Sequence, residues 1–347
     1  MMKSNTTTKN KADNTSYIAF TKSLSAGKVG GFYIFHGQER YLLEGSLKGL
    51  RALLCPDGLD SFNYKRFDGK AFSTKELEDA IDTLPAFADR TLIEIHDYDI
   101  FKNTQKERLC EIFSDLPDYV CVVFIYSTIE YKPDGRKKLD KEILKYADVI
   151  KFNVQDQDKL VDWIMRHFHD AGKKISKSDA EYIASVTGGL MTTLNGEIEK
   201  AAAYAKAEYV TRKDIDTVVT PVLDAIAFRL ADAIVGKDNA GALRLLDELL
   251  QMREEPHKLV YLISLRMRQL LAARVFIETN RGRTELMQLC DIRFDFIARN
   301  LMNTAKNTTL AYCREAVLLC SATALELNST AEPESRLIEL VVKLANI

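Results

Sequence analysis

A glycine-led turn, Gly37-Gln38-Glu39-Arg40, follows the first predicted strand, at the position where P-loop proteins carry their phosphate-binding loop. Such a loop needs a second glycine followed by a lysine and a hydroxyl, because backbone N–H groups cradle the phosphates and the lysine neutralises them. These residues do not follow Gly37 in register. The sequence therefore predicts no functional ATP site and no cofactor.

An acidic residue, Asp97, follows the predicted strand 91–96, at the place where an ATPase carries a magnesium-binding aspartate. The next residue is Tyr98, and not a glutamate that could polarise a water. Without a phosphate-loop lysine, Asp97 has no evident magnesium–nucleotide to bind. We therefore predict no intrinsic catalytic site.

Metal and disulfide chemistry are also disfavoured. Six cysteines form no C-x-x-C pair and mostly stand in apolar surroundings, which predicts reduced thiols in a cytoplasmic protein. His167 and His169 are the only close histidine pair, and without a third ligand nearby a solvated helix face is favoured over a metal site.

The net charge of −2 argues against a stand-alone duplex reader. No apolar run reaches the length of about eighteen residues that a membrane span needs.

Apolar residues recur at helical spacing in the stretch 74–84. Leu77, Ile81 and Leu84 follow one another at i, i+4 and i+7, which predicts one buried stripe on a helix. Pro85 disfavours the α conformation at the residue before it, so we expect the helix to end at Leu84.

The turn after this helix carries Phe87, shortly before a predicted strand at 91–96. One interpretation is a staple that folds back into the core, since large apolar side chains are mostly buried, and composition alone favours it. The other is an aromatic anchor offered to a partner's pocket, the type of residue that dominates interface energetics.

Short apolar runs alternate with helical periodicity between residues 31 and 152, which predicts a parallel sheet with crossover helices. The predicted strands are 32–36, 62–67, 91–96, 120–126 and 148–152. The predicted helices between them include 41–54, 74–84 and 104–113. After residue 152 the sequence predicts helices only. We expect a disordered tail over 1–15, an α/β domain over 16–154, and helical domains over 155–220 and 221–347.

Several short motifs occur in order along the first two thirds of the chain. They are 32–39, 62–64 with 68–69, 84–90, 132–139, 172–175 and 187–200. Together they resemble the delta subunit family of bacterial DNA polymerase III, the clamp-loader subunit that opens the sliding clamp. The C-terminal third matches mainly in its helical pattern.

The resemblance implies an AAA+-like parallel α/β domain with a degenerate P-loop, an all-α lid and an all-α collar that holds five subunits in a ring. It also implies a non-catalytic subunit of the DNA polymerase holoenzyme, which opens the clamp without hydrolysing ATP. The implied partners are the sliding clamp (beta subunit), the other clamp-loader subunits of a hetero-pentamer, and primed DNA through that assembly. No membrane is involved.

In this family an adjacent pair of apolar side chains at the helix end enters a hydrophobic pocket on the clamp, with another apolar residue just before it. The resemblance places Ala86 and Phe87 at the pair and Leu84 at the preceding position. Ala86 is smaller than the residue often found there. We therefore expect Phe87 to be the main anchor.

Arginines are dense between residues 266 and 299. Phosphate contacts need charge and not base-reading geometry, so this segment is a candidate for touching the DNA backbone. Solvated helix faces and pairing between subunits remain the favoured alternative. The candidate contacts are Arg266, Arg268, Arg274, Arg281 and Arg283. A stand-alone DNA-binding or scaffolding protein would use this segment as its main site, whereas an ATPase of the AAA+ class would need the missing phosphate loop.

Overall fold

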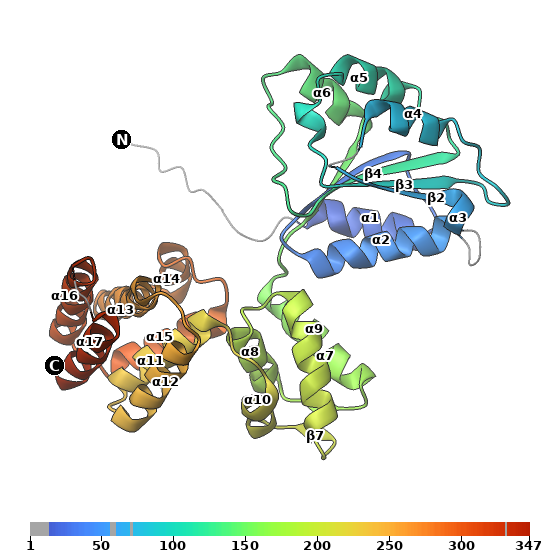
Figure 1. The fold of residues 1–347 in the computed structure, drawn as a ribbon. Coiled ribbons are helices and arrows are strands. Elements are labelled where there is room, and N and C mark those ends of the chain that lie inside the picture. Colours follow the sequence, from blue (N-terminus) through green and yellow to red (C-terminus); the bar gives the residue numbers. More distant parts are fainter. Residues whose placement is uncertain (1–13, 56–59, 70–71, 330–331) are drawn as a thin grey trace. The chain divides into compact units, whose positions relative to one another are not determined.

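The computed structural model describes residues 14–55, 60–69, 72–329 and 332–347 (Figure 1). The chain divides into two compact units, Met1–Gln155 and Asp156–Ile347. The predicted tail lies outside the described residues as far as residue 13, and its last residue, Thr15, begins helix α1 (Thr15–Ser25). A further division of the second unit at residue 220 stays a prediction.

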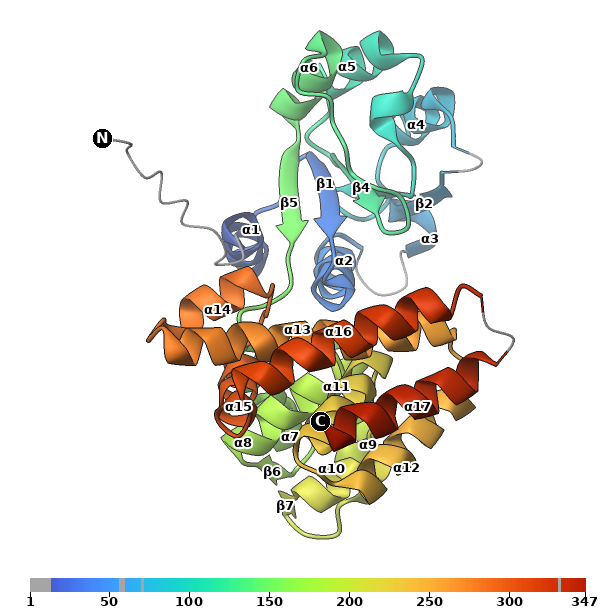
Figure 2. The ribbon, with the colours of Figure 1, turned by 90° about the vertical axis from the view of Figure 1, so that its left-hand side faces the viewer.

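A parallel sheet of five strands organises the first unit. Its strands are β1 (Phe32–Gly37), β2 (Tyr64–Asp68), β3 (Thr91–His96), β4 (Val120–Tyr126) and β5 (Asp148–Phe152). They lie in the order β2-β3-β4-β1-β5, and all the pairings are parallel. Figure 2 shows the neighbouring strands β1 and β5 running in the same direction. Strands β3 and β4 are buried along their whole length, as parallel strands are when helices cover both faces. The parallel α/β prediction is confirmed.

Helices cover the sheet on both faces (Figure 1). Helices α1 and α2 (Arg40–Leu54) lie on one face, where Phe20 and Leu47 pack with Phe35 in one apolar core. The other face holds α4 (Thr74–Ile81), α5 (Lys106–Ser114) and α6 (Lys138–Tyr146), whose core includes Phe113 and Ile143. The short elements are α3 (Asp60–Asn63), next to β2, and the 3₁₀ helix η1 (Ile100–Lys102).

The element that leads to the predicted anchor is shorter than expected. Helix α4 begins at a capping box and ends at Ile81, so the prediction of a helix through Leu84 is wrong. Two carbonyls of its last turn accept side-chain hydrogen bonds: Asp79 O from the Thr83 hydroxyl at 2.8 Å, and Ala80 O from the Lys65 ammonium at 3.4 Å. These contacts satisfy acceptors that a longer helix would have used.

The buried stripe of α4 is likewise only partly as predicted. Leu77 and Ile81 are buried, but Leu84 lies beyond the helix with its side chain exposed. The predicted strand 62–67 also begins late, at Tyr64, because Asn63 still belongs to α3. Both shifts lie at the same edge of the first unit, since the Asn63 side chain contacts the loop that follows α4.

Among its described residues, the second unit is helical apart from two strands of two residues each. Its helices are α7 (Gln157–Asp170), α8 (Lys177–Val186), α9 (Met191–Tyr204), α10 (Arg212–Val218), α11 (Leu223–Val235), α12 (Asn239–Gln251), α13 (Pro256–Glu278), α14 (Arg283–Leu289), α15 (Asp295–Lys306), α16 (Leu310–Glu326) and α17 (Pro333–Asn346). Strands β6 (Lys174–Ile175) and β7 (Tyr209–Val210) pair in parallel, so the expectation of helices alone is corrected there. Gly172, with φ of +74°, ends α7 and turns the chain toward β6.

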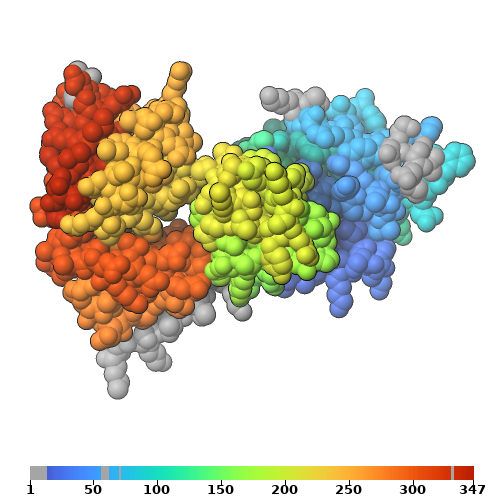
Figure 3. Space-filling view, turned by 90° about the horizontal axis from the view of Figure 1, so that it is seen from below, coloured from blue at the N-terminus to red at the C-terminus, as the bar shows by residue number. Residues whose placement is uncertain are grey.

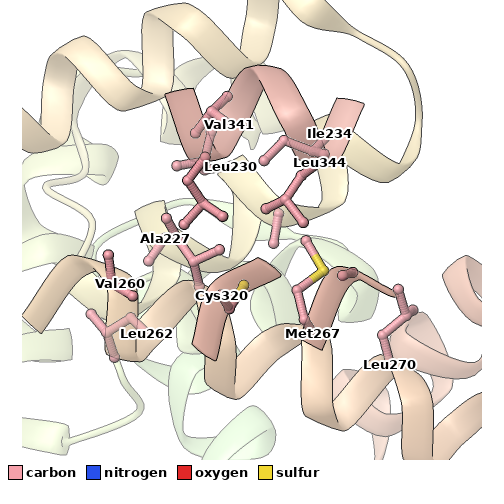
Figure 4. Packing of buried hydrophobic residues seen from close by; sticks show 14 of the residues in the cluster. Ala227, Leu230, Ile234, Val260, Leu262, Met267, Leu270, Cys320, Val341 and Leu344 are labelled. Carbon is pink, nitrogen blue, oxygen red and sulfur yellow. The ribbon is translucent and has the colours of Figure 1, made fainter. Parts of the chain in front are cut away.

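Helix α13 is the centre of the C-terminal core. It packs against α11, α15, α16 and α17, and Figure 4 shows Met267 of α13 beside Leu344 of α17. In the space-filling view the segments from α11 to α17 form one continuous group of atoms, coloured gold to red (Figure 3). In the described part of the chain, no helix is both long and apolar enough to cross a membrane.

Candidate functional site

Exposed apolar side chains distinguish the loop of residues 82–90, between α4 and β3. The side chain of Phe87 is 89% exposed and that of Leu84 is 69% exposed, while Ala86 is half-buried. A phenylalanine that stapled the loop to the core would be buried, so the staple interpretation is wrong. The loop instead presents two large apolar groups to solvent, where a partner's pocket could cover them.

The backbone of Phe87 has an unusual conformation, with φ of +58°. This left-handed region brings the Cβ atom close to the following carbonyl oxygen, which costs a residue with a side chain about 1–2 kcal/mol. Such strain persists only where the surroundings determine it, and it is common at binding sites. The conformation therefore needs a structural cause close to Phe87.

The side-chain amide of Asn63 is hydrogen-bonded to Ala86, the residue before Phe87. Its Oδ1 accepts a hydrogen bond from Ala86 N–H at 2.7 Å, and its Nδ2 donates one to Ala86 O at 2.7 Å. Asn63 is fully buried, and its own carbonyl accepts a hydrogen bond from the Cys55 thiol at 3.5 Å. Each buried hydrogen bond contributes about 0.5–1.5 kcal/mol net, so the pair offsets the strain at Phe87.

The far end of the loop is fixed by Arg90. Its guanidinium donates to the carbonyl oxygens of Val29 at 2.6 Å, Gly30 at 3.1 Å and Val120 at 2.8 Å. These three acceptors come from the segment before β1 and from β4, so Arg90 ties the entry into β3 to two other parts of the sheet. The loop is thus held on both sides of Phe87 while its apolar side chains stay exposed.

A buried carboxylate supports the strands behind the loop. Glu94 of β3 accepts hydrogen bonds from Arg51 Nε at 2.7 Å and from the Tyr64 hydroxyl at 3.0 Å, and lies 3.0 Å from His96 Nε2. Burial alone would raise the pKa of Glu94, but the hydrogen bonds from His96, Arg51 and Tyr64 outweigh it and lower the pKa. Since Tyr64 begins β2 directly after Asn63, this cluster fixes the chain next to Asn63.

The turn after β1, where a phosphate loop would stand, is closed by the chain itself. A Cβ atom on Gly37, which has φ of +137°, would lie 2.2 Å from the carbonyl oxygen of Phe152. Glu39 N–H donates to the same carbonyl at 3.0 Å, and the side chain of Glu39 is fully buried. Arg40 donates to the carbonyl of Ser127 at 2.6 Å. The turn therefore holds the buried acidic side chain of Glu39, and the guanidinium of Arg40 binds a protein carbonyl.

Asp97, directly after β3, has a structural role. Its Oδ1 accepts hydrogen bonds from the backbone N–H groups of Ser127 and Thr128, both at 2.7 Å. Burial opposes ionisation, but the hydrogen bonds from Thr128 and Ser127 prevail and lower the pKa of Asp97. Asp97 thus fastens the segment after β4. Among the described residues, no group of three or more His, Cys, Asp or Glu side chains could hold a metal ion.

Comparison with known proteins identifies the family. A family model described as DNA polymerase III, delta subunit matches residues 33–153, and one for the C-terminal domain of that subunit matches residues 224–344. Together the two matches span well over half of the chain. The chain belongs to the DNA polymerase III delta subunit family. The predicted fold class, a parallel α/β domain followed by helical segments, agrees with the fold of this chain.

Individual relatives agree with this family. DNA polymerase III subunit delta of Bacillus subtilis is 26% identical over 275 residues, which cover 76% of this chain and 78% of the relative. A probable DNA polymerase III subunit delta of Aquifex aeolicus is 21% identical over 276 residues, covering 76% and 77%. The solved Bacillus subtilis DNA clamp loader delta protein has a TM-score of 0.55 at 22% identity, over 95% of this chain and 99% of that one. This last likeness supports the fold.

In this delta-family chain the candidate arginines are mostly paired with carboxylates. Arg274 pairs with Glu278, Arg281 with Glu285 and Arg283 with Asp295, all of them within the helical unit. Arg266 is buried, with 4% exposure, and its guanidinium binds Asp232 at 3.0 Å. The expectation that Arg266 is a surface cation is therefore wrong.

Arg268 differs from the other four candidates. Its side chain is exposed, and within the described residues it has no ion pair, only a position 5.9 Å over the ring of Tyr261. It is therefore the candidate whose charge is most available to a phosphate.

The sequence pattern did not predict the roles of Asn63, Arg90 and Glu94. Asn63 and Ala86 are separated by 23 positions, and no periodicity links them. Asn63 and Arg90 lie within the family-like motifs 62–64 and 84–90, so the motifs marked the right stretches without indicating a role for either residue. The sequence analysis gave Glu94 no role, although a charged residue inside an apolar strand calls for a buried partner.

Proposed function

We propose that this chain is the clamp-loader subunit that binds the ring-shaped sliding clamp through Phe87, Leu84 and Ala86 and stabilises the clamp with one interface open. The opened ring is then loaded onto primed DNA during replication. The exposure of Phe87 carries this proposal, because a strained and solvent-exposed phenylalanine on a well-anchored loop has the properties of an interface hot spot. Membership of the DNA polymerase III delta subunit family supports the choice of the sliding clamp as the partner.

The available binding energy sets the scale of the effect. Burying one phenylalanine side chain is worth about 1.5–3 kcal/mol from area alone. A bound subunit shifts the clamp's closed–open equilibrium only by the difference between its affinities for the two states. In this proposal Phe87 and Leu84 provide affinity for the clamp. Opening requires that the bound surface fit the open ring better than the closed ring.

The chain acts in this proposal without hydrolysing ATP. The motif for a phosphate loop is missing, and Glu39 occupies the turn after β1 as a buried acid. Partner ATPase subunits of a hetero-pentamer would then control access to Phe87, with the C-terminal helices as the collar that joins the subunits. Arg268, with Arg274, Arg281 and Arg283 as weaker candidates, would face the backbone of primed DNA. We place this activity in the cytoplasm, where the chromosome is replicated.

The direct test is binding of the purified chain to the sliding clamp of the same organism, without nucleotide. We expect Phe87→Ala to weaken binding at least about tenfold while the fold stays intact, as for a hot-spot residue. Ile18→Ala is the matched control, because Ile18 is another exposed apolar residue of the first unit, on α1. Circular dichroism and thermal unfolding would verify that both variants are folded.

The alternatives make different predictions for the same proteins. Equal affinity of folded Phe87→Ala and wild type would sink the assignment of Phe87. No clamp binding by either, together with tight duplex binding of steep salt dependence, would favour a stand-alone DNA-binding or scaffolding protein. Measurable ATP binding by the isolated chain would instead favour an ATPase of the same class.

A further inference from the structure

The conformation of the loop around Phe87 depends on a residue outside it. We propose that Asn63 is a positioning residue for clamp binding, which holds Phe87 in its presenting conformation before the clamp arrives. This inference rests on the proposed function, since it deepens the account of the same site. Asn63 makes no contact with the clamp in this proposal and acts through the backbone of Ala86.

The two hydrogen bonds of Asn63 fix two successive peptide groups. Ala86 N–H belongs to the peptide before Ala86, and Ala86 O belongs to the peptide that leads into Phe87. Because both hydrogen bonds are 2.7 Å long, the peptide plane between Ala86 and Phe87 cannot rotate freely. The φ of +58° at Phe87 then sets the direction of its side chain relative to a fixed plane.

The chemistry of asparagine suits this task. An amide side chain offers one carbonyl acceptor and an NH₂ donor, which complement the N–H and C=O of a single residue. An ionised aspartate has acceptors only, so it would meet Ala86 N–H favourably and Ala86 O unfavourably. Alanine would provide neither partner. A comparison of asparagine, aspartate and alanine at this position therefore distinguishes the contributions of the two hydrogen bonds.

Asn63 is itself held firmly enough to act as a support. Its side chain is fully buried, the Cys55 thiol donates to its carbonyl, and Tyr64 after it is bonded to the buried Glu94. A loop fixed in its bound conformation loses less conformational freedom on binding, and so binds more tightly than a mobile loop with the same side chains. The affinity gain from Asn63 should thus appear only when Phe87 is present.

The experiment measures clamp affinity of the full chain for Asn63→Ala, Phe87→Ala and the double variant. We expect Asn63→Ala to weaken binding about tenfold, and to change it less than about twofold in the Phe87→Ala background. Asn103→Ala is the matched control, since Asn103 also joins two residues of the first unit, Thr74 and Tyr98, by side-chain hydrogen bonds. It should leave clamp affinity unchanged.

Hydrogen exchange separates positioning from general destabilisation. In Asn63→Ala the amides of Ala86 and Phe87 should exchange faster while those of β3 and β4 keep their protection. If Asn63→Ala does not fold, Asn63→Asp takes its place, because it keeps the size and the acceptor for Ala86 N–H, while it replaces the donor to Ala86 O by a charged oxygen. The positioning role would be overturned if Asn63→Ala weakened clamp binding as much in the Phe87→Ala background as in wild type. A loss of exchange protection across β3 and β4 would also overturn it.

The outcomes also distinguish this inference from the proposed function. If Phe87→Ala binds the clamp as well as wild type does, the proposed anchor fails. If Phe87→Ala weakens binding and folded Asn63→Ala does not, the anchor stands and the positioning role of Asn63 is wrong.

Discussion

The sequence predicted partner contacts in two regions of this chain, and the two regions differ in how far their side chains find partners within the chain itself. The 82–90 loop exposes Phe87 and Leu84, whereas the arginine-rich segment between 266 and 299 neutralises most of its charge within the same unit. The loop keeps apolar groups in water and the arginines find carboxylates. The difference lies in what each kind of side chain can gain locally.

A surface arginine gains an ion pair with little rearrangement, because acidic residues lie four positions further along the chain. The pairs Arg274–Glu278 and Arg281–Glu285 have this i, i+4 spacing. An exposed phenylalanine gains nothing from a neighbouring charge, and covering it requires the backbone to move. Exposure of Phe87 on a loop that Asn63 and Arg90 hold in place is therefore more informative about a partner than a local density of arginines.

The largest effect is expected at the buried arginine. Arg266→Ala should lower the free energy of unfolding by about 2 kcal/mol, less than for a fully buried pair because Asp232 can be rehydrated. Denaturant unfolding followed by circular dichroism measures this loss, and DNA affinity of the folded variant should not change. Arg274→Ala is the control, with an expected loss of about 0.3–0.5 kcal/mol for an i, i+4 pair. Equal losses would remove the distinction between buried and surface arginines.

Acid tests the polar support behind the loop. A carboxylate whose pKa is lowered on folding stabilises the protein above its unfolded pKa, about 4.3, and this contribution is lost as the pH falls through the folded pKa. Glu94 is such a group, with Arg51, Tyr64 and His96 as its hydrogen-bond partners. We expect Glu94→Gln to be less stable than wild type near neutral pH, and to lose less stability on acidification. Parallel curves of unfolding midpoint against pH for the two proteins would contradict this role of Glu94.

Leu84 should matter less than Phe87 within the loop. Its side chain is smaller and is 69% exposed, against 89% for Phe87. We expect Leu84→Ala to weaken clamp binding about threefold, a contact at the edge of a hot spot. Surface plasmon resonance with immobilised clamp, and Ile18→Ala as the control, measures the difference. A loss larger than that of Phe87→Ala would place the main anchor at Leu84.

The sheet could be predicted because buried parallel strands are nearly continuous apolar runs, as 120–126 illustrates. The loop conformation could not, because it depends on Asn63 meeting Ala86 across 23 positions. At the end of α4, before Leu84, a local contact from Thr83 combines with one from Lys65, distant in sequence, to bind carbonyls of the last turn. Tertiary contacts with no periodic signature therefore decided the loop conformation and contributed to the end of α4.

The error at Arg266 was avoidable from the sequence. Leu259, Ile263, Leu270 and Ala273 are buried on α13, and Arg266 falls at the helical spacing between them. A count of positive charges ignores this, whereas the periodicity places Arg266 on the buried face. Charge density predicts a contact surface only after each charge has been assigned to a face of its helix.

The smallest expected effect concerns Arg268. It is exposed, and among the described residues it lacks a carboxylate partner, unlike Arg281. In the assembled clamp loader, Arg268→Gln should weaken binding to primed DNA about twofold and reduce the salt slope by about 1, the effect of losing one phosphate contact. Arg281→Gln is the matched comparison and should change both less, since Glu285 already neutralises that charge. If both variants lower the slope equally, intramolecular pairing does not decide which arginines reach DNA, and the contrast with the 82–90 loop would rest on the loop alone.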